Sequence, residues 1–375
     1  MIKRFMELKI AELRSKGKAL ILLGARRTGK TTLLNMISLN NQDTAWLNAD
    51  EPEVRALFEH FGSAQFGFLF GGKKNLVIDE AQRIQDIGIK LKLIIDQFPE
   101  INMIVSGSSS LDLANKINEP LTGRKIELRL FPLSFQEMVD HHGWLKEKQL
   151  IPYRLIYGYY PEIVTKPEDA RRNLVEISES YLFKDLFSYE GIHKPGKLMK
   201  LVQALALQMG KEVSYLELSR MVELDKETIE KYIGLLEQAF IVFRLPAFSR
   251  NLRKELKRGR KIYFYDNGIR NAVLSNFSPL ELRQDVGGLW ENFLISERLK
   301  VLKYNDIYSN AYFWRTQDQQ EIDYIEDRDG ILHAFEFKWK SKPGYKFSRT
   351  FTESYPVHSL NVIHSGNFEE FLSLK

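Results

Sequence analysis

The residues with the clearest chemistry lie near the start of the chain. Gly24 is followed by four residues and then by Gly29-Lys30-Thr31, which is the Walker A spacing. The apolar run 20–23 precedes this motif, and the residues after it indicate the start of a helix. Glycines let successive backbone N–H groups point inward, and a helix start adds partial positive charge. The stretch therefore predicts a loop that binds a polyphosphate.

Each residue type in this motif has an expected role. Lys30 is expected to bind the β- and γ-phosphates, and the hydroxyl of Thr31 is expected to coordinate Mg²⁺. The loop and the first turn of the helix would together surround the phosphates. The residues predicted to bind the nucleotide are Gly24, Ala25, Arg26, Arg27, Thr28, Gly29, Lys30, Thr31 and Thr32.

A second chemical pattern lies at 75–80, where an apolar run ends in Asp79-Glu80. An apolar strand that ends in acids is the Walker B pattern. A parallel strand carries such carboxylates to the same edge of the sheet as the P-loop. Asp79 is expected to complete the Mg²⁺ shell, and Glu80 to orient and polarise the water that attacks the γ-phosphate.

Two further positions are candidates for the same site. A predicted strand at 102–105 is followed by small polar residues, among which Ser108 or Ser106 is expected to sense the γ-phosphate or position the water. The alternative is a solvated, serine-rich turn. Arg124, which follows Gly123, is expected to act as an arginine finger in the same or a neighbouring subunit. The alternative for Arg124 is a surface ion pair.

The elements that would position these residues alternate between strands and helices. An amphipathic helix is expected within 1–18, and strands are predicted at 20–23, 44–48, 75–79, 102–105 and 125–130. This alternation is typical of a parallel, three-layer α/β sheet. A strand inserted between the two Walker strands, together with Glu80, favours the AAA-like, additional-strand branch of P-loop proteins. The sequence has no Asn-Lys-x-Asp motif for reading guanine, which disfavours the GTPase branch.

The middle of the chain changes to a helical pattern. Ser214 and Asp225 are predicted to cap the two helices of a helix-turn-helix. Strand-like runs at 239–245 and 261–265 flank a basic stretch at 250–261, which favours a winged helix. The basic stretch is expected to contact DNA phosphates as a wing. A solvated loop, or a lid over the nucleotide domain, is the alternative.

The C-terminal third carries a second set of reactive residues on predicted strands. Glu336 and Lys338 face the same side of one strand because side chains alternate, and Asp323 lies on the strand paired with it. Two acids that hold Mg²⁺, beside a lysine that steadies the attacking water, follow the logic of metal-dependent phosphodiester hydrolysis. Glu291, on the preceding predicted helix, would supply a further acid. The alternative is ordinary strand alternation, with Glu336 and Lys338 facing solvent.

Composition limits these expectations. The chain has 375 residues, which is long enough for two or three domains. It contains no cysteine, which excludes disulfides, thiolate metal sites and a cysteine nucleophile. The net charge of +5 permits a polyanionic partner without requiring one. The apolar runs are too short for a signal peptide or a membrane span, so a cytoplasmic location without membrane contact is expected.

Taken in order, these motifs resemble the prokaryotic AAA-type ATPases that pair a P-loop domain with a C-terminal, restriction-endonuclease-like domain of unknown function. The matching segments are 24–31, 78–82, 106–109, 121–124, 131–135, 158–161, 261–268, 288–292, 321–324 and 336–338. One departure is Tyr159, which stands where the family turn commonly has a second glycine.

The resemblance implies that the chain binds ATP and Mg²⁺ and hydrolyses ATP. It also assigns Arg124 to the nucleotide site and implies a PD-(D/E)-x-K type fold at the C-terminus. The expected domains are an AAA-like P-loop ATPase domain at 1–140, a helical region with a winged helix at 141–270, and a restriction-endonuclease-like domain at 271–375.

Three uses of the nucleotide follow as hypotheses. In the first, ATP binding and hydrolysis switch the arrangement of the winged-helix and C-terminal domains, on DNA or with a protein partner. The second is an ATP-gated, metal-dependent nuclease. The third is a DNA- or protein-binding switch that hydrolyses ATP slowly. The oligomeric state is open, and it decides whether Arg124 can act in a neighbouring chain.

Overall fold

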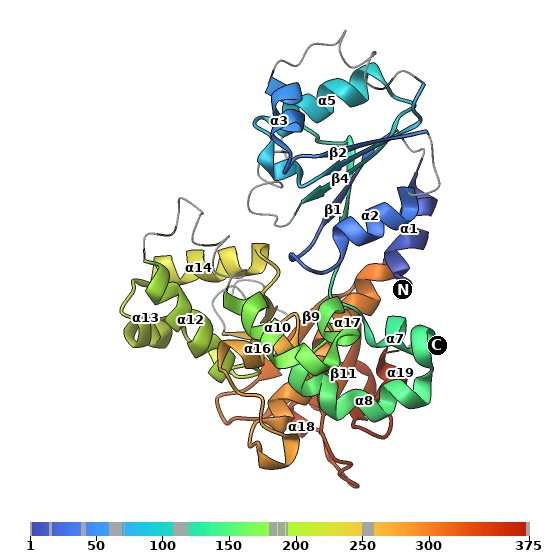
Figure 1. Ribbon diagram of the computed structural model, residues 1–375. Coiled ribbons are helices and arrows are strands. Elements are labelled where there is room, and N and C mark those ends of the chain that lie inside the picture. Colours follow the sequence, from blue (N-terminus) through green and yellow to red (C-terminus); the bar gives the residue numbers. More distant parts are fainter. Residues whose placement is uncertain are drawn as a thin grey trace. The chain divides into compact units, whose positions relative to one another are not determined.

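The computed structural model of this protein describes residues 2–14, 17–38, 43–59, 70, 72–107, 117, 120–179, 186, 192, 194–249 and 259–372. The chain divides into two compact units (Figure 1). The first consists of Met1–Leu133 with Gln238–Phe240, and the second of Ser134–Glu237 with Ile241–Lys375. The expected domain boundaries after residues 140 and 270 stay predictions.

The first unit is built on a parallel, five-stranded sheet with the order β2-β3-β4-β1-β5. The strands are β1 (Ala19–Leu23), β2 (Thr44–Asn48), β3 (Asn75–Asp79), β4 (Asn102–Gly107) and β5 (Lys125–Arg129). All five lie where the sequence predicts strands. Because β4 pairs with both β1 and β3, the predicted additional strand separates the P-loop strand from the Walker B strand.

Helices cover both faces of this sheet. α2 (Lys30–Ser38) lies on one face, and α3 (Pro52–Glu59) and α5 (Ile87–Gln97) lie on the other (Figure 1). Right-handed crossovers require this arrangement, because the chain moves outward from β1 to β2 and then returns through β3 to β4. The first unit therefore has the predicted three-layer α/β architecture.

Burial explains why these segments form strands. Every residue of β1 and of β3 is buried, as expected for parallel strands that helices cover on both faces. The leading helix α1 (Phe5–Leu13) is shorter than the amphipathic stretch expected at 1–18. It buries Met6 and Ile10, whereas Leu8 is 61% exposed.

The second unit begins with a series of helices. They are α7 (Phe135–His142), α8 (Trp144–Tyr157), α9 (Pro161–Thr165) and α10 (Ala170–Ile177). A reciprocal capping box starts α7: the Ser134 hydroxyl accepts from the Glu137 N–H, and the Glu137 carboxylate accepts from the Ser134 N–H. Within the described ranges, no helix combines the length and apolarity that a membrane crossing needs.

A small antiparallel sheet follows, with the order β6-β8-β7. Its elements and the helices beside it in sequence are α12 (Pro195–Leu207), β6 (Glu212–Val213), α13 (Tyr215–Val222), α14 (Lys226–Gln238), β7 (Val242–Pro246) and β8 (Arg260–Phe264). Ser214 caps α13 through the Glu217 N–H, and Asp225 accepts from the Thr228 N–H at the start of α14. The assignment of this region as a winged helix stays a prediction.

The remainder of the second unit is a four-stranded sheet with the order β12-β11-β10-β9. Its elements are α16 (Asn267–Val273), α17 (Val286–Tyr304), β9 (Asn310–Arg315), β10 (Glu321–Arg328), β11 (Ile331–Phe337), α18 (Arg349–Ser354), β12 (Val357–Ile363) and α19 (Phe368–Leu372). β9, β10 and β11 are antiparallel, whereas β12 runs parallel to β11. Trp314, Ile325 and Phe351 belong to its buried core. The restriction-endonuclease-like assignment stays a prediction.

Candidate functional site

The P-loop joins the end of β1 to the start of α2, so it lies at the carboxyl edge of the parallel sheet. Gly24 packs against the chain that follows β5, because a Cβ there would lie 2.3 Å from the Leu130 carbonyl oxygen. Gly29 has φ +93°, which glycine adopts without strain. Gly24 is therefore required by a close backbone approach, and Gly29 by a positive φ angle.

Lys30 turns back onto the loop that precedes it. Its side chain is buried, and Nζ donates hydrogen bonds to the carbonyl oxygens of Gly24 (2.9 Å) and Ala25 (3.0 Å). The buried Thr28 hydroxyl donates to the Ala25 carbonyl at 2.7 Å. These contacts hold the ammonium group beside the loop. The remaining predicted loop residues are more exposed; they are Arg26, Arg27, Thr31 and Thr32.

The structure brings the two Walker motifs into direct contact. Thr31 Oγ1 donates a hydrogen bond to Asp79 Oδ2 at 2.7 Å. Ser106, near the end of β4, donates to the other carboxylate oxygen of Asp79. Asp79 is 2% exposed. Because each of its carboxylate oxygens accepts a hydrogen bond from one of these hydroxyl groups, the orientation of the carboxylate is fixed. A hydroxyl and a carboxylate in contact are oxygen ligands of the kind that Mg²⁺ prefers, so this pair fits the ion.

Glu80 follows Asp79 at the same edge of the sheet. Its backbone is left-handed (φ 54°, ψ 38°), a conformation that costs a non-glycine residue on the order of 1 kcal/mol. Glu80 Oε2 accepts a hydrogen bond from Gln82 Nε2 at 2.6 Å. Gln82 therefore orients the Glu80 carboxylate, which the sequence predicts to polarise the attacking water. The motif match includes Gln82, but the sequence alone gave no reason to assign it a role.

Of the two serine candidates, the structure describes only Ser106. Ser108 lies outside the described residues, so its predicted contact with the γ-phosphate stays a prediction. Ser106, its alternative, contacts Asp79 and also lies 3.4 Å from the backbone nitrogen of Glu80. Ser106 thus supports both Walker B acids.

Arg124 lies at the other edge of the sheet. Its carbonyl accepts a hydrogen bond from the N–H of Ala19, the first residue of β1, whereas the P-loop follows the last. Its Nε donates to Asp96 Oδ1 at 2.8 Å, which is the surface ion pair of the alternative interpretation. This placement corrects the expectation that Arg124 reaches the nucleotide of its own chain, since a residue before a parallel strand lies at the amino edge. A role in a neighbouring chain stays a prediction.

Comparison with known proteins gives family matches along most of the chain. Residues 16–139 match a family model described as an AAA domain. Residues 148–280 and 286–373 match two domains of unknown function, DUF8612 and DUF4143. The AAA match spans both Walker motifs and supports ATP binding or hydrolysis by this chain.

A solved structure with a similar fold is the Walker-type ATPase of Pyrococcus abyssi. The match has a TM-score of 0.50 and 14% sequence identity, and covers 73% of this chain and 96% of that chain. A likeness at this identity concerns the fold alone, and it agrees with the parallel, five-stranded sheet and its additional strand. The first unit has the fold of a P-loop ATPase. The C-terminal match to a domain of unknown function leaves the nuclease-like assignment as a proposal.

Two similar proteins carry only the description uncharacterized. One, from Mycobacterium tuberculosis, is 26% identical over 336 residues, which are 88% of this chain and 72% of that protein. Another, from Haemophilus influenzae, is 25% identical over 345 residues, which are 84% of this chain and 81% of that protein. These lengths exceed the P-loop ATPase domain, so the similarity continues into the second unit.

Outside the P-loop ATPase domain, the predicted second set of residues also comes together. Lys338 Nζ donates to Glu336 Oε2 at 2.8 Å and lies 3.6 Å from Asp323 Oδ2. Asp323 Oδ2 accepts from the Phe337 N–H at 2.8 Å, which fixes this acid beside β11. Among the described residues, no three acidic or histidine side chains form a group that could hold a metal ion. The lysine instead contacts both acids.

Burial shifts the protonation of these groups. Burial and the charge of Asp323 raise the pKa of Glu336 to about 7, although Lys338 opposes this shift. Burial also raises the pKa of Glu291 to about 7 against the lowering effect of Lys261. Burial lowers the pKa of Lys338, but the two acids outweigh it and the pKa is raised. Glu336 and Glu291 therefore bind a proton at higher pH than exposed glutamates do.

Glu291 is held by two residues of β8, Lys261 and Tyr263, for which the sequence predicted no contact with an acid. Lys261 Nζ lies 3.0 Å from Glu291 Oε1 and 2.5 Å from Glu321 Oε1. The Tyr263 hydroxyl donates to Glu291 Oε1 at 2.5 Å. Lys261 and Tyr263 point to the same side of the strand because side chains alternate. That alternation is visible in the sequence, but the acid that they contact is not.

The described part of the basic stretch binds protein groups. Residues 250–258 lie outside the described ranges. Arg260 Nη1 donates to the Tyr215 hydroxyl at 3.1 Å and to Glu230 Oε1 at 3.2 Å, while Lys261 is buried. The expected DNA contact therefore depends on 250–258 and stays a prediction.

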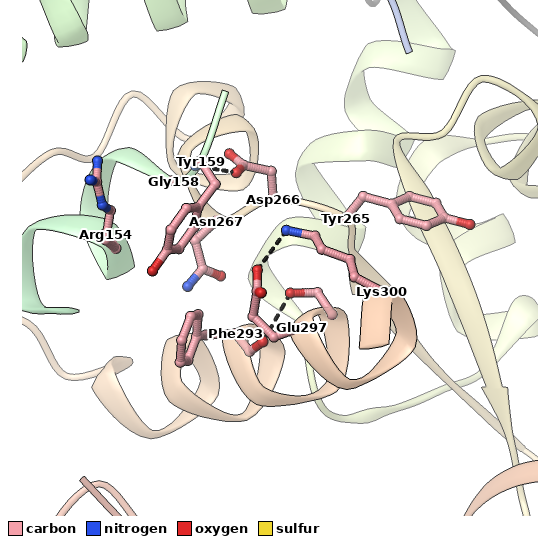
Figure 2. A pocket seen from close by; sticks show the side chains of 10 residues that line it. Arg154, Gly158, Tyr159, Tyr265, Asp266, Asn267, Phe293, Glu297 and Lys300 are labelled. Atoms are coloured by element: carbon pink, nitrogen blue, oxygen red, sulfur yellow. Dashed lines mark hydrogen bonds and ion pairs between the residues drawn. The ribbon is translucent and has the colours of Figure 1, made fainter. Parts of the chain in front are cut away.

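A small pocket in the second unit brings together residues of two of the matching segments, 158–161 and 261–268 (Figure 2). Figure 2 shows the Asp266 carboxylate beside Tyr159 and the Lys300 ammonium beside Glu297. Asp266 Oδ2 accepts from the Tyr159 N–H at 2.6 Å, and Lys300 Nζ donates to Glu297 Oε1 at 2.6 Å. Burial raises the pKa of both acids. The paired charges and backbone contacts indicate a structural role for this cluster.

Two asparagines of the matching segments 261–268 and 288–292 also make backbone contacts. The Asn292 side chain accepts from the Phe264 N–H (2.7 Å) and donates to the Phe264 carbonyl (3.1 Å). Asn267 Nδ2 donates to the Leu289 carbonyl at 2.9 Å. These residues attach α17 to β8 and to the start of α16, so their presence in the motif series is explained by folding.

Proposed function

We propose that this chain binds ATP with Mg²⁺, hydrolyses ATP, and uses the nucleotide state to change the arrangement of its winged-helix and C-terminal parts. The observation that carries this proposal is the 2.7 Å hydrogen bond between Thr31 and Asp79, with Glu80 next in sequence. The P-loop, Asp79 and Glu80 thus lie at one edge of one sheet, which supports the proposed roles in binding phosphate and Mg²⁺ and in activating water. The AAA-domain match over 16–139 supports the same conclusion.

The chain's own residues divide the work of hydrolysis. Lys30 exchanges its contacts with the Gly24 and Ala25 carbonyls for phosphate oxygens. Thr31 and Asp79 would hold Mg²⁺, which would supply positive charge to the phosphate oxygens when bound. Glu80, oriented by Gln82, accepts a hydrogen bond from the attacking water and polarises it.

The connection between the units suggests how the nucleotide state is transmitted. The Leu130 N–H donates to the Leu23 carbonyl at 2.7 Å, and Gly24 packs on the Leu130 carbonyl. The second unit begins soon afterwards, at Ser134. A change in the P-loop therefore acts on the residues that lead into the second unit.

A binding measurement with matched lysine variants tests the proposal. The intact protein should bind a fluorescent ATP analogue in the presence of Mg²⁺. Lys30→Ala should weaken that binding roughly 100-fold, because it removes a charge-assisted contact to the phosphates. Lys92→Ala, an exposed lysine on α5, is the control and should bind as the wild type does. Absence of binding by the wild type, or unchanged binding by Lys30→Ala, would contradict the proposal.

A second candidate function is metal-dependent hydrolysis of nucleic acid by the second unit. The observation that favours it is the contact of Lys338 with Glu336 and its proximity to Asp323, with the charge of Asp323 also acting on Glu291. Asp323 and Glu336 supply carboxylate oxygens that suit Mg²⁺ or Mn²⁺, which would activate water when bound. Lys338 would then stabilise negative charge on the phosphate.

Plasmid cleavage tests this second candidate. With Mn²⁺, the wild type should convert supercoiled plasmid to open or linear forms, and Lys338→Ala should lower the rate by roughly 100-fold. Lys340→Ala removes an exposed lysine two residues away and should cut normally. Comparing Lys30→Ala with and without ATP shows whether the cutting is nucleotide-gated. A wild type that cuts nothing, or a Lys338→Ala protein that cuts equally well, would rule out this site.

A further inference from the structure

Arg4 makes a contact with the P-loop that no motif predicts. It precedes α1 and is 5% exposed. Its Nη1 donates to the Thr28 carbonyl at 2.8 Å, and its Nη2 donates to the Phe131 carbonyl at 2.7 Å. One guanidinium group thus joins the nucleotide loop to the chain after β5.

The contact with Thr28 has a consequence for the phosphate site. In a trans peptide, the carbonyl of one residue and the N–H of the next point in opposite directions. When Arg4 binds the Thr28 carbonyl from one side, the Gly29 N–H must point to the other side. Gly29 is a motif glycine, and its N–H belongs to the group of amides that the P-loop offers to phosphate.

Three other hydrogen bonds hold the loop at the carbonyls of Gly24 and Ala25, and none of them is to the Thr28 carbonyl that Arg4 binds. Lys30 holds the carbonyls of Gly24 and Ala25, and the Thr28 hydroxyl also bonds to Ala25. None of these groups fixes the plane between Thr28 and Gly29. The planar fork of arginine suits this task, because it can donate to two carbonyls in one fixed geometry.

The contact with Phe131 ties the same guanidinium to the segment between the units. Phe131 is buried, and the first unit ends at Leu133. Arg4 therefore contacts both the loop that would bind phosphate and the residues that continue into Ser134.

We propose that Arg4 is a positioning residue for the ATP site: it orients the Thr28–Gly29 peptide for phosphate binding and links the loop to Phe131. This inference rests on the proposed nucleotide binding. Arg4 touches no phosphate itself, and acts through the main chain of the loop.

The test compares Arg4→Ala and Arg4→Lys with the wild type in binding a fluorescent ADP analogue. Arg4→Ala should bind roughly 10- to 100-fold more weakly, the effect of losing hydrogen bonds from a charged donor. The ADP affinity of Arg4→Lys should lie between those of the wild type and Arg4→Ala, since an ammonium group keeps the charge but cannot donate to two carbonyls in the fixed geometry of a guanidinium group. The control is Arg55→Ala, which also removes a guanidinium bonded to two carbonyls. Arg55 is half-buried, and its Nη1 donates to the carbonyls of Ala49 and Asp50, which follow the edge strand β2. It should bind ADP as the wild type does.

Chemical rescue separates positioning from a general loss of structure. Methylguanidinium, added at millimolar concentration, should restore ADP affinity to Arg4→Ala and leave the wild type and Arg55→Ala unchanged. Circular dichroism melting without nucleotide reports whether each variant is folded. Wild-type affinity in Arg4→Ala, or a loss that Arg4→Lys and methylguanidinium both fail to relieve, would overturn the proposal. Failure of the wild type to bind ADP would instead overturn the proposed function, and the inference with it.

Discussion

Glu80→Gln should retain ATP binding and lose ATP turnover by roughly 100- to 1,000-fold. The substitution keeps the size and shape of the side chain but removes the negative charge that polarises the attacking water. The amide oxygen of the new side chain can still accept a hydrogen bond from Gln82, which donates to Glu80 Oε2 at 2.6 Å. The left-handed backbone at Glu80 is equally accessible to glutamine, so the fold should be unaffected.

Two measurements on the same protein check this result. Phosphate release with Mg²⁺ reports turnover, and titration with a fluorescent ATP analogue reports binding. Glu53→Gln is a matched control, because Glu53 is an exposed acid on α3 of the same unit. It should hydrolyse ATP at the wild-type rate. Full turnover by Glu80→Gln would remove Glu80 from the water-activating role.

Gly158→Ala should destabilise the second unit by more than about 3 kcal/mol. Gly158 has φ 71° and ψ −159°, a region of backbone conformation open almost only to glycine. A Cβ there would also lie 2.0 Å from Asp266 Oδ1. Asp266 cannot move aside cheaply, since it is buried and accepts hydrogen bonds from the N–H groups of Tyr159 and Ile269. Backbone strain and the loss of a buried polar contact therefore both lower the free energy of unfolding.

Urea unfolding followed by tryptophan fluorescence measures this effect in the intact chain. Gly234→Ala is the matched control, because Gly234 lies inside α14 and a Cβ there meets no atom within 4 Å. That substitution should be neutral or should stabilise by up to about 1 kcal/mol, the helix propensity difference between glycine and alanine. Equal stabilities for Gly158→Ala and Gly234→Ala would contradict the structural role of the Gly158 turn.

In the second unit, sequence patterns predicted some strands and missed others. The two paired strands that carry Asp323 and Glu336 are predicted from side-chain alternation, and they correspond to β10 and β11. The parallel strand β12 and helices α18 and α19 were not predicted, because a parallel partner needs no short turn to mark it. The motif at 158–161 was visible in the sequence, but its purpose became clear only from Asp266, which is 107 residues from Tyr159.

The sequence by itself determined the nucleotide loop, both Walker motifs and the five strands of the first unit. These features are local: the spacing of Gly24 and Lys30, and apolar runs ending in acids, follow from chemistry within a few residues. Only the tertiary structure decided which edge of the sheet Arg124 occupies, because edge depends on strand direction and register. Only the tertiary structure also brought Arg4 to Phe131, 127 residues away, and Lys261 to Glu291. Such contacts depend on how distant segments pack, and residue spacing along the chain carries no record of that packing.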